Sequence, residues 1–261
     1  MANIKVIIPR HNDAKYKMFA EPSTKKIGTQ ALQVFDKVPG ANESIFKKYN
    51  AGIEAAMNAD LTDDDIVIFM HEDIGMVDNL FKEKIELLFT EKTDVGLVGI
   101  AGATELTEKG GWWMTTPDKM RGHLIQGKDG GGQGEGFHLV KGPIGYFDDL
   151  VAIDGCFMVT KGRFLKEGIS FDTETFEHND FYDIDFGFQF LDKGYKIAVA
   201  DILIYHQSTG MGVFKDEWKS SRDKLFEKWK AKGYTMPFKV GDEEGQFKPK
   251  QELNEIVEID I

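Results

Sequence analysis

Two short apolar runs near the start of the chain predict buried strands. Residues 4–8 are rich in β-branched side chains and end at Pro9, and residues 66–70 are followed directly by charged residues. Continuous apolar runs of this length are typical of strands that are covered on both faces. The apolar residues between them recur at helical spacing and predict a helix of about three to four turns: Phe46, Tyr49, Ile53 and Met57. A strand, a helix and a second strand form the unit of a parallel sheet.

The alternation of helix and strand continues along the chain. Apolar positions between residues 80 and 89 predict a helix that Asp78 caps, and residues 95–101 predict a third strand. Another strand is expected over residues 151–160, which are again mostly apolar. Helices and strands that alternate in this way favour one parallel sheet covered by helices.

Two more helices are expected in the C-terminal half. Residues 180–193 predict a helix that ends at Gly194, and residues 195–205 predict one or two strands that lead to His206. Apolar residues at helical spacing predict a last helix, which Gly233 ends: Phe214, Trp218, Leu225 and Trp229. We therefore expect an α/β fold, a three-layer α/β/α sandwich with a mostly parallel sheet of about six strands.

Residues 105–149 interrupt this pattern. They contain the adjacent tryptophans Trp112 and Trp113 and then residues 127–136, of which six are glycine. Long loops in compact domains are usually functional or disordered, so we expect a mobile loop that becomes ordered when a ligand binds. The glycines match neither the dinucleotide-binding pattern nor the P-loop, because no lysine-serine pair follows them.

Composition narrows the classes of protein. The length of 261 residues suits one large domain, which we expect at residues 1–215, with residues 216–261 as a C-terminal helix and an acidic extension. The 44 acidic and 32 basic residues give a net charge of -12, which opposes bulk binding to nucleic acid or to anionic lipid. The single cysteine, Cys156, excludes an internal disulfide, and no apolar run has the length of a membrane span, so we expect a cytoplasmic protein.

Three of the predicted strands end in polar residues that are suited to chemistry. These ends lie at residues 71–73, 154–155 and 206–208, and ligands of open α/β sheets bind beyond the carboxyl ends of strands. Asp73 and His206 form a natural pair, because carboxylate oxygen and imidazole nitrogen are ligands that Mn²⁺ or Mg²⁺ accepts in enzymes. Each also has a structural alternative, a loop carboxylate for Asp73 and a buried histidine for His206.

The neighbours of Asp73 are open to more than one interpretation. His71 is a third candidate metal ligand, and it is equally suited to contact a nucleotide or a neighbouring loop. Glu72 points to the other side of a continuing strand and is expected to hold a helix end or a ribose. We expect the other four histidines to lie on the surface or in loops: His11, His123, His138 and His178.

Two carboxylates stand among aromatic residues at the start of the helix predicted over residues 180–193. Asp183 and Asp185 are flanked by phenylalanine and tyrosine, and a carboxylate in such surroundings is partly desolvated. Desolvation raises the basicity of a carboxylate, so both are candidate catalytic residues. The alternative is that they complement the helix dipole in its first turn, and one of the two is expected to be structural.

At these residues the chain resembles the family 2 glycosyltransferases and, within them, the subfamily related to a streptomycin-biosynthesis protein. The resemblance runs from about residue 4 to about residue 212 and includes segments in the order of the family. These are IIPRHN (7–12), KYNAGI (48–53), IVIFMHEDI (66–74), AIDGCFMVTKGRF (152–164), YDIDFGFQFLDKGYKI (182–197) and YHQSTG (205–210). His71 stands where the first aspartate of the metal motif usually lies, Tyr182 replaces a glutamate, and Gln189 replaces a frequent arginine.

The resemblance implies a GT-A fold and metal-dependent, inverting transfer of a sugar from a nucleotide-sugar donor to an acceptor hydroxyl. It places Asp183 as the catalytic base and Asp73 at the metal, with His206 closing the metal site. The donor would be a UDP-, GDP-, CDP- or dTDP-sugar. The residues implied on the nucleotide side are Pro9, Asn12, Asn50 and Gly52. Asp154 would bind the donor sugar.

Several points stay open at this level. The indoles of Trp112 and Trp113 are suited to form a platform for the acceptor, or they are core residues under the loop. A sugar-nucleotide nucleotidyltransferase shares the expected architecture and metal, but it would carry a glycine-rich basic loop after the first strand. A catalytically silent carbohydrate-binding or structural protein is the third alternative, against which Asp73, Asp183 and His206 argue. The sequence does not specify the acceptor or the oligomeric state.

Overall fold

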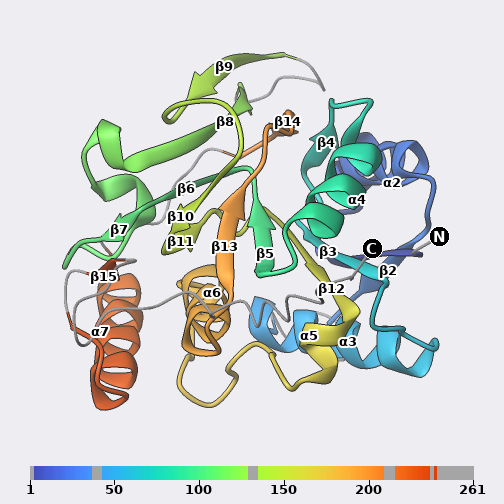
Figure 1. Ribbon diagram of the computed structural model, residues 1–261. Helices are drawn as coiled ribbons and strands as arrows, with labels where there is room; N and C mark the ends of the chain where they lie inside the picture. The colour runs from blue at the N-terminus through green and yellow to red at the C-terminus, as the bar shows by residue number, and fades with distance from the viewer. Residues whose placement is uncertain (1–2, 37–42, 129–134, 209–214, 236–237, 240–261) are drawn as a thin grey trace, which may run out of the picture.

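The fold is described from a computed structural model of the chain. The structure describes residues 3–36, 43–128, 135–208, 215–235 and 238–239. Within these residues the chain forms a central sheet, a second sheet that leans over one end of it, and helices on both sides (Figure 1).

The central sheet has seven strands in the described part of the chain, in the order β10-β13-β5-β12-β3-β1-β2. Their bounds are β1 (Ile4–Pro9), β2 (Ala31–Val34), β3 (Ile66–Met70), β5 (Val95–Gly99), β10 (Phe147–Leu150), β12 (Phe157–Lys161) and β13 (Lys196–Val199). β1 is parallel to both β2 and β3, and β5 is parallel to β13, whereas β12 and β10 pair antiparallel with their neighbours. The sheet is therefore mixed, and its central strands are continuously apolar because helices cover both faces.

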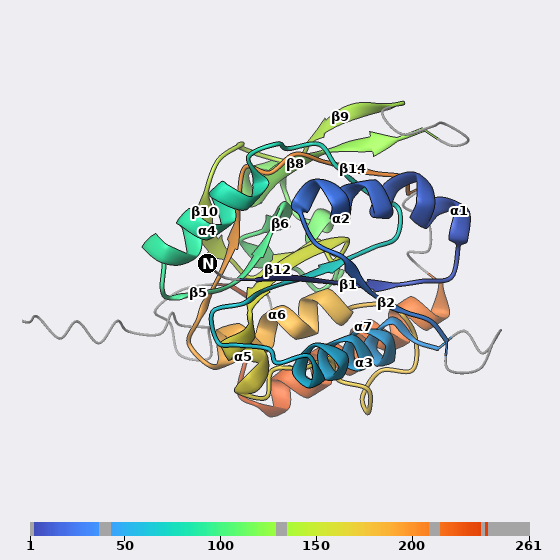
Figure 2. The ribbon, with the colours of Figure 1, turned by 90° about the vertical axis from the view of Figure 1, so that its right-hand side faces the viewer.

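Helices form the two outer layers of the sandwich. Figure 2 shows α3 (Ile45–Asn58), α5 (Gly162–Lys166) and α6 (Tyr182–Asp192) on one side of the central sheet. On the other side lie α2 (Glu21–Ile27) and α4 (Phe81–Glu91), with the short α1 (Asp13–Lys15) and a π-helical turn (Tyr16–Ala20) leading into α2. The last helix, α7 (Asp216–Ala231), packs on α6, where Trp229 lies edge-on against Phe188.

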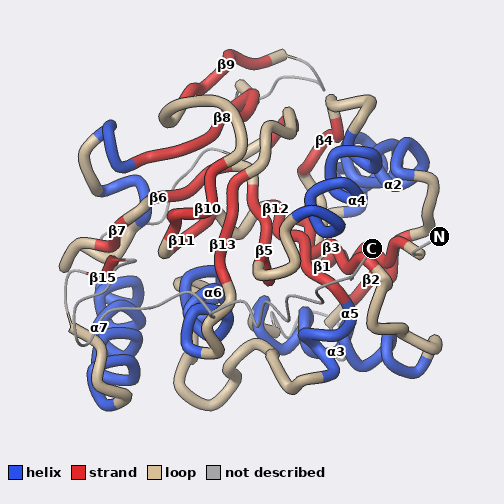
Figure 3. Tube along the Cα trace, in the orientation of Figure 1, coloured by secondary structure: helices blue, strands red, loops and turns tan. Residues whose placement is uncertain are grey.

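A second sheet lies beyond the carboxyl ends of the central strands. It contains β4 (Ile74–Met76), β6 (Ala101–Ala103), β8 (Met120–Gly127), β11 (Ala152–Ile153) and β14 (Ile204–His206), and β9 (Gly136–Val140) pairs with β8. Figure 3 shows β8 and β9 side by side at the edge of the molecule, away from α6 and α7. A short pair, β7 (Glu105–Leu106) with β15 (Phe238–Lys239), ties the segment after α7 to the region before β8.

The expectation of one long loop over residues 105–149 was wrong. The segment holds β7, two 3-10 turns (Trp112–Met114 and Pro117–Lys119), β8, β9 and β10. β8 is half-buried and contains glycines, and β9 is mostly exposed, so the apolar pattern that marks the central strands is absent. Most of the glycine-rich stretch, residues 129–134, lies outside the described residues.

The other predicted elements agree with the structure apart from their bounds. The strand expected at 151–160 is split into β11 and β12 by a turn at residues 154–156, and α6 ends where Gly194 takes a left-handed φ of 79°. Asp78 does not cap α4 directly; it accepts a hydrogen bond from the amide of Leu80 in the preceding turn, 2.8 Å away. Phe214 and the acidic extension at 241–261 lie outside the described residues, so the division at residue 215 stays a prediction. None of the described helices combines the length and the apolar character that crossing a membrane requires.

Candidate functional site

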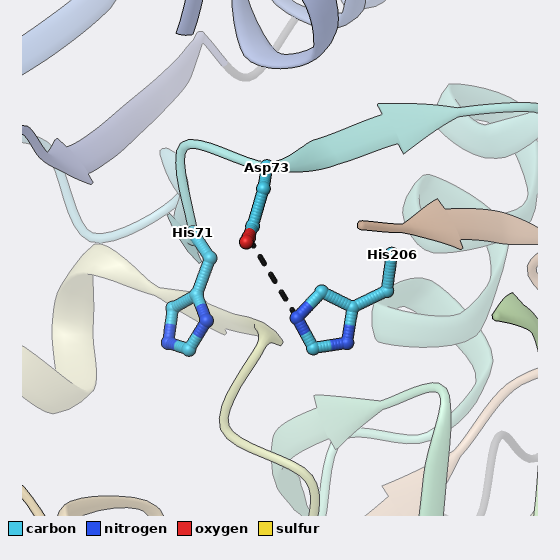
Figure 4. Close-up of side chains that lie close together, drawn as sticks. All are labelled: His71, Asp73 and His206. Atoms are coloured by element: carbon cyan, nitrogen blue, oxygen red, sulfur yellow. Dashed lines mark ion pairs between the residues drawn. The ribbon is translucent and has the colours of Figure 1, made fainter. Parts of the chain in front are cut away.

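Strand ends that are distant in the sequence bring three candidate metal ligands together. His71 and Asp73 follow β3, and His206 ends β14, which pairs with β4 directly after Asp73. One ligand atom of each residue lies within 4.8 Å of the other two, and the side chains face one another (Figure 4). Within the described ranges this is the one group of three or more His, Cys, Asp or Glu residues with that geometry. His71 therefore lies beside Asp73 and His206, the pair that the sequence indicated as metal ligands.

The electrostatics of this cluster suit metal binding. Burial lowers the pKa of His71 to about 4, so its imidazole is neutral at pH 7 and its nitrogen can act as a ligand. Burial opposes the charge of Asp73, but His206, His71 and Lys15 outweigh it and hold the pKa of Asp73 below its ordinary value. Asp73 Oδ1 lies 3.6 Å from His206 Nε2, which leaves both groups available to one cation. One carboxylate and two imidazoles form a donor set that fits a divalent transition ion such as Mn²⁺.

Tyr182 links this cluster to the start of α6. Its hydroxyl lies 2.7 Å from His71 Nε2, within hydrogen-bond distance. Tyr182 follows Phe181, which takes a left-handed φ of 65°, a conformation that non-glycine residues rarely adopt. The sharp entry into α6 sets Tyr182 and Asp183 side by side beneath the turn at residues 154–156.

Asp183 lies against that turn. Its Oδ2 accepts a hydrogen bond from the amide of Gly155 at 2.9 Å, and Asp154 Oδ1 accepts one from the amide of Cys156 at 2.9 Å. A Cβ at position 155 would lie 2.4 Å from the hydroxyl oxygen of Tyr182 and 2.7 Å from Asp183 Cβ, so only glycine allows this approach. Burial, with the nearby charge of Asp154, raises the pKa of Asp183 to about 7. A carboxylate with such a pKa is suited to accept a proton near neutral pH.

Asp185 lies elsewhere, on the face of α6 that contacts α7. Its side chain is 1% exposed, and its Oδ1 accepts hydrogen bonds from Lys228 Nζ at 2.7 Å and from the indole nitrogen of Trp229 at 2.9 Å. The structure therefore separates the two candidate carboxylates. Asp183 faces the cluster of strand ends, and Asp185 joins two helices.

Glu72 holds the turn that follows β1. Its carboxylate accepts hydrogen bonds from the amides of His11 and Asn12 at 2.9–3.1 Å and lies 3.0 Å from His11 Nδ1. The side chain of Asn12 in turn accepts hydrogen bonds from the amides of Ala14 and Lys15, both at 3.1 Å, and caps α1. These two predicted nucleotide-side residues are thus joined to each other in a structural turn.

Two cavities lie on either side of the metal-ligand cluster. One, of about 240 Å³, is lined by Pro9, His11, Glu43, Ile45, Lys48, His71, Glu72, Asp73, Asn179 and Tyr182. The other, of about 360 Å³, is lined by Trp112, Trp113, Leu124, Gln126, Leu139, Lys141, Asp154, Gly155, Asp180, Tyr182, Asp183, His206, Ser208 and Trp218. Tyr182 therefore separates a cavity that holds Pro9 and Asp73 from one that holds Asp154 and Asp183. A larger cavity of about 650 Å³ lies at the amino ends of β1 and β3, away from these residues.

The two tryptophans differ in accessibility. Trp112 is 2% exposed and Trp113 is 38% exposed, and their rings meet edge to face at 5.8 Å. Trp112 thus serves the core beneath the second cavity, and Trp113 presents its indole to solvent. Trp112 is therefore a core residue, whereas a platform for the acceptor at Trp113 stays a prediction.

Asn50 and Gly52 line neither cavity. Asn50 exchanges two hydrogen bonds with the backbone of Phe171, at 2.7 and 2.9 Å, and so fixes the segment before α6. A Cβ at Gly52 would lie 2.2 Å from Ile7 Cγ2, so glycine lets α3 pack closely on β1. Both residues support the sheet beneath the site.

Lys15 was not predicted, yet it contacts the centre of the site. Its Nζ lies 2.9 Å from Asp73 Oδ2 and 3.3 Å from the carbonyl oxygen of Gln207. The contact joins residues 58 positions apart, and nothing in the local sequence distinguishes Lys15 from the other lysines around it.

The surface or loop position expected for His123 was wrong. His123 is buried, at 6% exposure, and its imidazole nitrogens lie 2.8 Å from His138 Nε2 and 2.9 Å from Asp201 Oδ1.

Comparison with known proteins assigns the family. The sequence profile of a glycosyltransferase-like family matches residues 7–229, which is most of the chain. Among curated proteins, none matches significantly. The solved structure of GalNAc-T7 with UDP, GalNAc and Mn²⁺ is similar in fold, with a TM-score of 0.50 and 11% identity over 87% of this chain and 48% of that chain.

A second solved structure, the mannosyltransferase PcManGT from Pyrobaculum calidifontis in complex with GDP-Man and Mn²⁺, matches with a TM-score of 0.45. Its identity is 12% over 80% of this chain and 58% of that chain. The chain thus spans about half the length of the structures that it matches. The family profile and the shared α/β architecture lead to one assignment: the chain belongs to the glycosyltransferase-like family and has the GT-A fold.

Proposed function

We propose that this protein transfers a sugar from a nucleotide-sugar donor to an acceptor hydroxyl, with a divalent cation held by His71, Asp73 and His206. The observation that carries the proposal is the position of this cluster between two cavities, one of which contains Asp183. Metal-dependent, inverting transfer uses a cation at the leaving diphosphate and a base on the acceptor side, and the cluster and Asp183 are the groups suited to these tasks.

The donor set favours Mn²⁺ over Mg²⁺. Two imidazole nitrogens and one carboxylate suit a transition ion, whereas Mg²⁺ prefers oxygen ligands and retains several waters. When bound, such a cation neutralises charge that develops on the departing nucleoside diphosphate. The Mn²⁺ in the similarly folded GalNAc-T7 structure agrees with this choice of metal.

The cavity beside Pro9 and Glu72 is assigned to the nucleotide, and the cavity beside Trp113 and Asp183 to the acceptor. In this assignment Asp154, which lines the acceptor cavity, accepts a hydrogen bond from the donor sugar. The exposed indole of Trp113 offers an apolar face on which an acceptor ring can stack.

Asp183 is proposed as the base of a single, inverting displacement. Its Oδ accepts the proton of the acceptor hydroxyl while that oxygen forms a bond to the anomeric carbon and the bond to the diphosphate breaks. Desolvation keeps the pKa of Asp183 near 7, so the carboxylate is basic enough to take the proton and is still largely ionised at slightly alkaline pH.

The proposal is tested by incubating the protein with UDP-, GDP-, CDP- and dTDP-sugars and measuring release of the nucleoside diphosphate. We expect slow hydrolysis of at least one donor with Mn²⁺ present and none in chelator. Asp73→Asn, which keeps the shape of the side chain and removes its charge, should abolish the release. Release that is equal in chelator, or no release from any donor, would overturn the proposal.

A further inference from the structure

Lys15 binds one oxygen of Asp73, the carboxylate among the three candidate metal ligands. Its Nζ contacts Asp73 Oδ2 at 2.9 Å, while the other oxygen of Asp73 faces His206. The ammonium also lies 3.3 Å from the carbonyl oxygen of Gln207, the residue after His206. A positive charge of the protein itself therefore lies between the two strand ends that hold the candidate metal ligands.

The local structure is built to bring Lys15 there. Glu72, next to Asp73 in the sequence, binds the amides of His11 and Asn12, and the side chain of Asn12 binds the amide of Lys15. This chain of contacts fixes α1 close to Asp73. The side chain of Lys15 is nevertheless 38% exposed, so the protein does not enclose it on its solvent side.

A divalent cation bound to Asp73 would repel the ammonium of Lys15, which contacts the same carboxylate. Two positive charges at contact distance in a partly buried site repel each other, and the lysine is the one that can move. A diphosphate bound at the cation would offer new oxygen atoms to the displaced ammonium. Lysine is a common point-charge ligand for phosphate oxygens.

We propose that Lys15 is an exchangeable cation of the donor site: it holds Asp73 in the metal-free protein and moves to the donor diphosphate when a divalent cation takes Asp73. The inference rests on the proposed function and adds a donor-binding residue to it. It also makes metal and nucleotide bind cooperatively, because the diphosphate gives Lys15 a partner after the metal has removed its first one.

The exchange predicts opposite effects of one substitution on two binding constants. Lys15→Met keeps the length of the side chain and removes its charge. Without nucleotide, it should tighten Mn²⁺ binding about three- to tenfold, measured from the electron paramagnetic resonance signal of free Mn²⁺, because the competing ammonium is gone. With Mn²⁺ saturating, it should weaken binding of the preferred diphosphate among UDP, GDP, CDP and dTDP about tenfold by calorimetry, the size of one lost charge-assisted hydrogen bond.

Lys17→Met is the matched control, because Lys17 is exposed in the next turn and its loss removes the same charge. It should leave both constants within about twofold of the wild type. If Lys15→Met changes neither constant, or only one of them, the exchange is overturned while the metal site and the proposed function stand. If neither the wild type nor the variant binds Mn²⁺, the metal site fails, and the exchange fails with it.

Discussion

Replacing Asp183 with asparagine is expected to stabilise the metal-free protein at alkaline pH while it removes transfer. Burial and the charge of Asp154 raise the pKa of Asp183 from 3.8 to about 7, so the folded protein holds this proton over a range in which the unfolded chain has lost it. The fold is therefore disfavoured as the pH rises from about 4 through about 7, because the buried group must then ionise. The asparagine side chain would not ionise and would escape this cost.

The magnitude follows from the two pKa values. At about 1.4 kcal/mol per pH unit, the full cost of the ionised Asp183 at pH 8 is about 4 kcal/mol of the free energy of unfolding. Asparagine has one acceptor oxygen in place of two, whereas Asp183 accepts hydrogen bonds from the amides of Gly155 and Ile184. Losing one of these costs about 1 to 2 kcal/mol. The net gain is therefore about 2 to 3 kcal/mol at pH 8.

Urea denaturation of both proteins in chelator measures this gain. The difference in the free energy of unfolding between Asp183→Asn and the wild type should grow by about 2 kcal/mol between pH 5.5 and pH 8. At pH 8 the melting temperature of the variant should be about 5 °C higher. Its transfer rate should fall about 10²- to 10⁴-fold with donor affinity nearly unchanged.

A difference in stability that does not change with pH would refute the raised pKa of Asp183. A variant that is less stable at pH 8 would show that the carboxylate stabilises the fold through its hydrogen bonds more than its burial costs. Full transfer activity in the variant would remove Asp183 from the role of base.

Three further predictions concern the metal, the acceptor cavity and α6. A nucleoside diphosphate should raise the melting temperature only with Mn²⁺ or Mg²⁺ present, and at 100 times its dissociation constant it should add about 2.7 kcal/mol to the free energy of unfolding; equal stabilisation in chelator would contradict this. Trp113→Ala should raise the acceptor KM about tenfold and leave donor hydrolysis unchanged. Loss of both transfer and donor hydrolysis would instead indicate that Trp113 supports the core, as Trp112 does. Asp185→Asn should leave transfer in the folded protein intact, because Asp185 pairs with Lys228 on α7 and lines neither cavity; loss of transfer there would show that the wrong carboxylate carries the chemistry.

The sequence predicted the central part of the fold because its signals are local. The apolar run of β3, the helical stripe of α3 and the glycine after α6 each follow from residues next to one another. Both GT-A fold and family were likewise predicted from short segments in a characteristic order, and the family profile confirms them. The assignment to a streptomycin-related subfamily stays a prediction.

The features that the sequence did not predict depend on contacts between distant residues. β8 pairs with β9 and with β14, but β8 is only half-buried and β9 is mostly exposed, so no run of apolar residues marks them. The contact of Lys15 with Asp73 and that of Asp185 with Lys228 appear only when helices pack against strands or helices far along the chain. The residue types in the first turn of α6 do not distinguish its two carboxylates. The family resemblance favours Asp183 as the base, and the packing of Asp185 against α7 agrees with a structural role for Asp185.

The central claim, a divalent cation between the ends of β3 and β14, is tested most directly by the anomalous diffraction of crystals grown with Mn²⁺ and a nucleoside diphosphate. The account predicts one strong anomalous peak within coordination distance of Asp73 and His206, with His71 as a third ligand and diphosphate oxygens completing the site. It also predicts that Lys15 Nζ has left Asp73 for the diphosphate. A nucleotide bound in the cavity of Pro9 and Glu72 without such a peak, or a peak at other residues, would contradict the account.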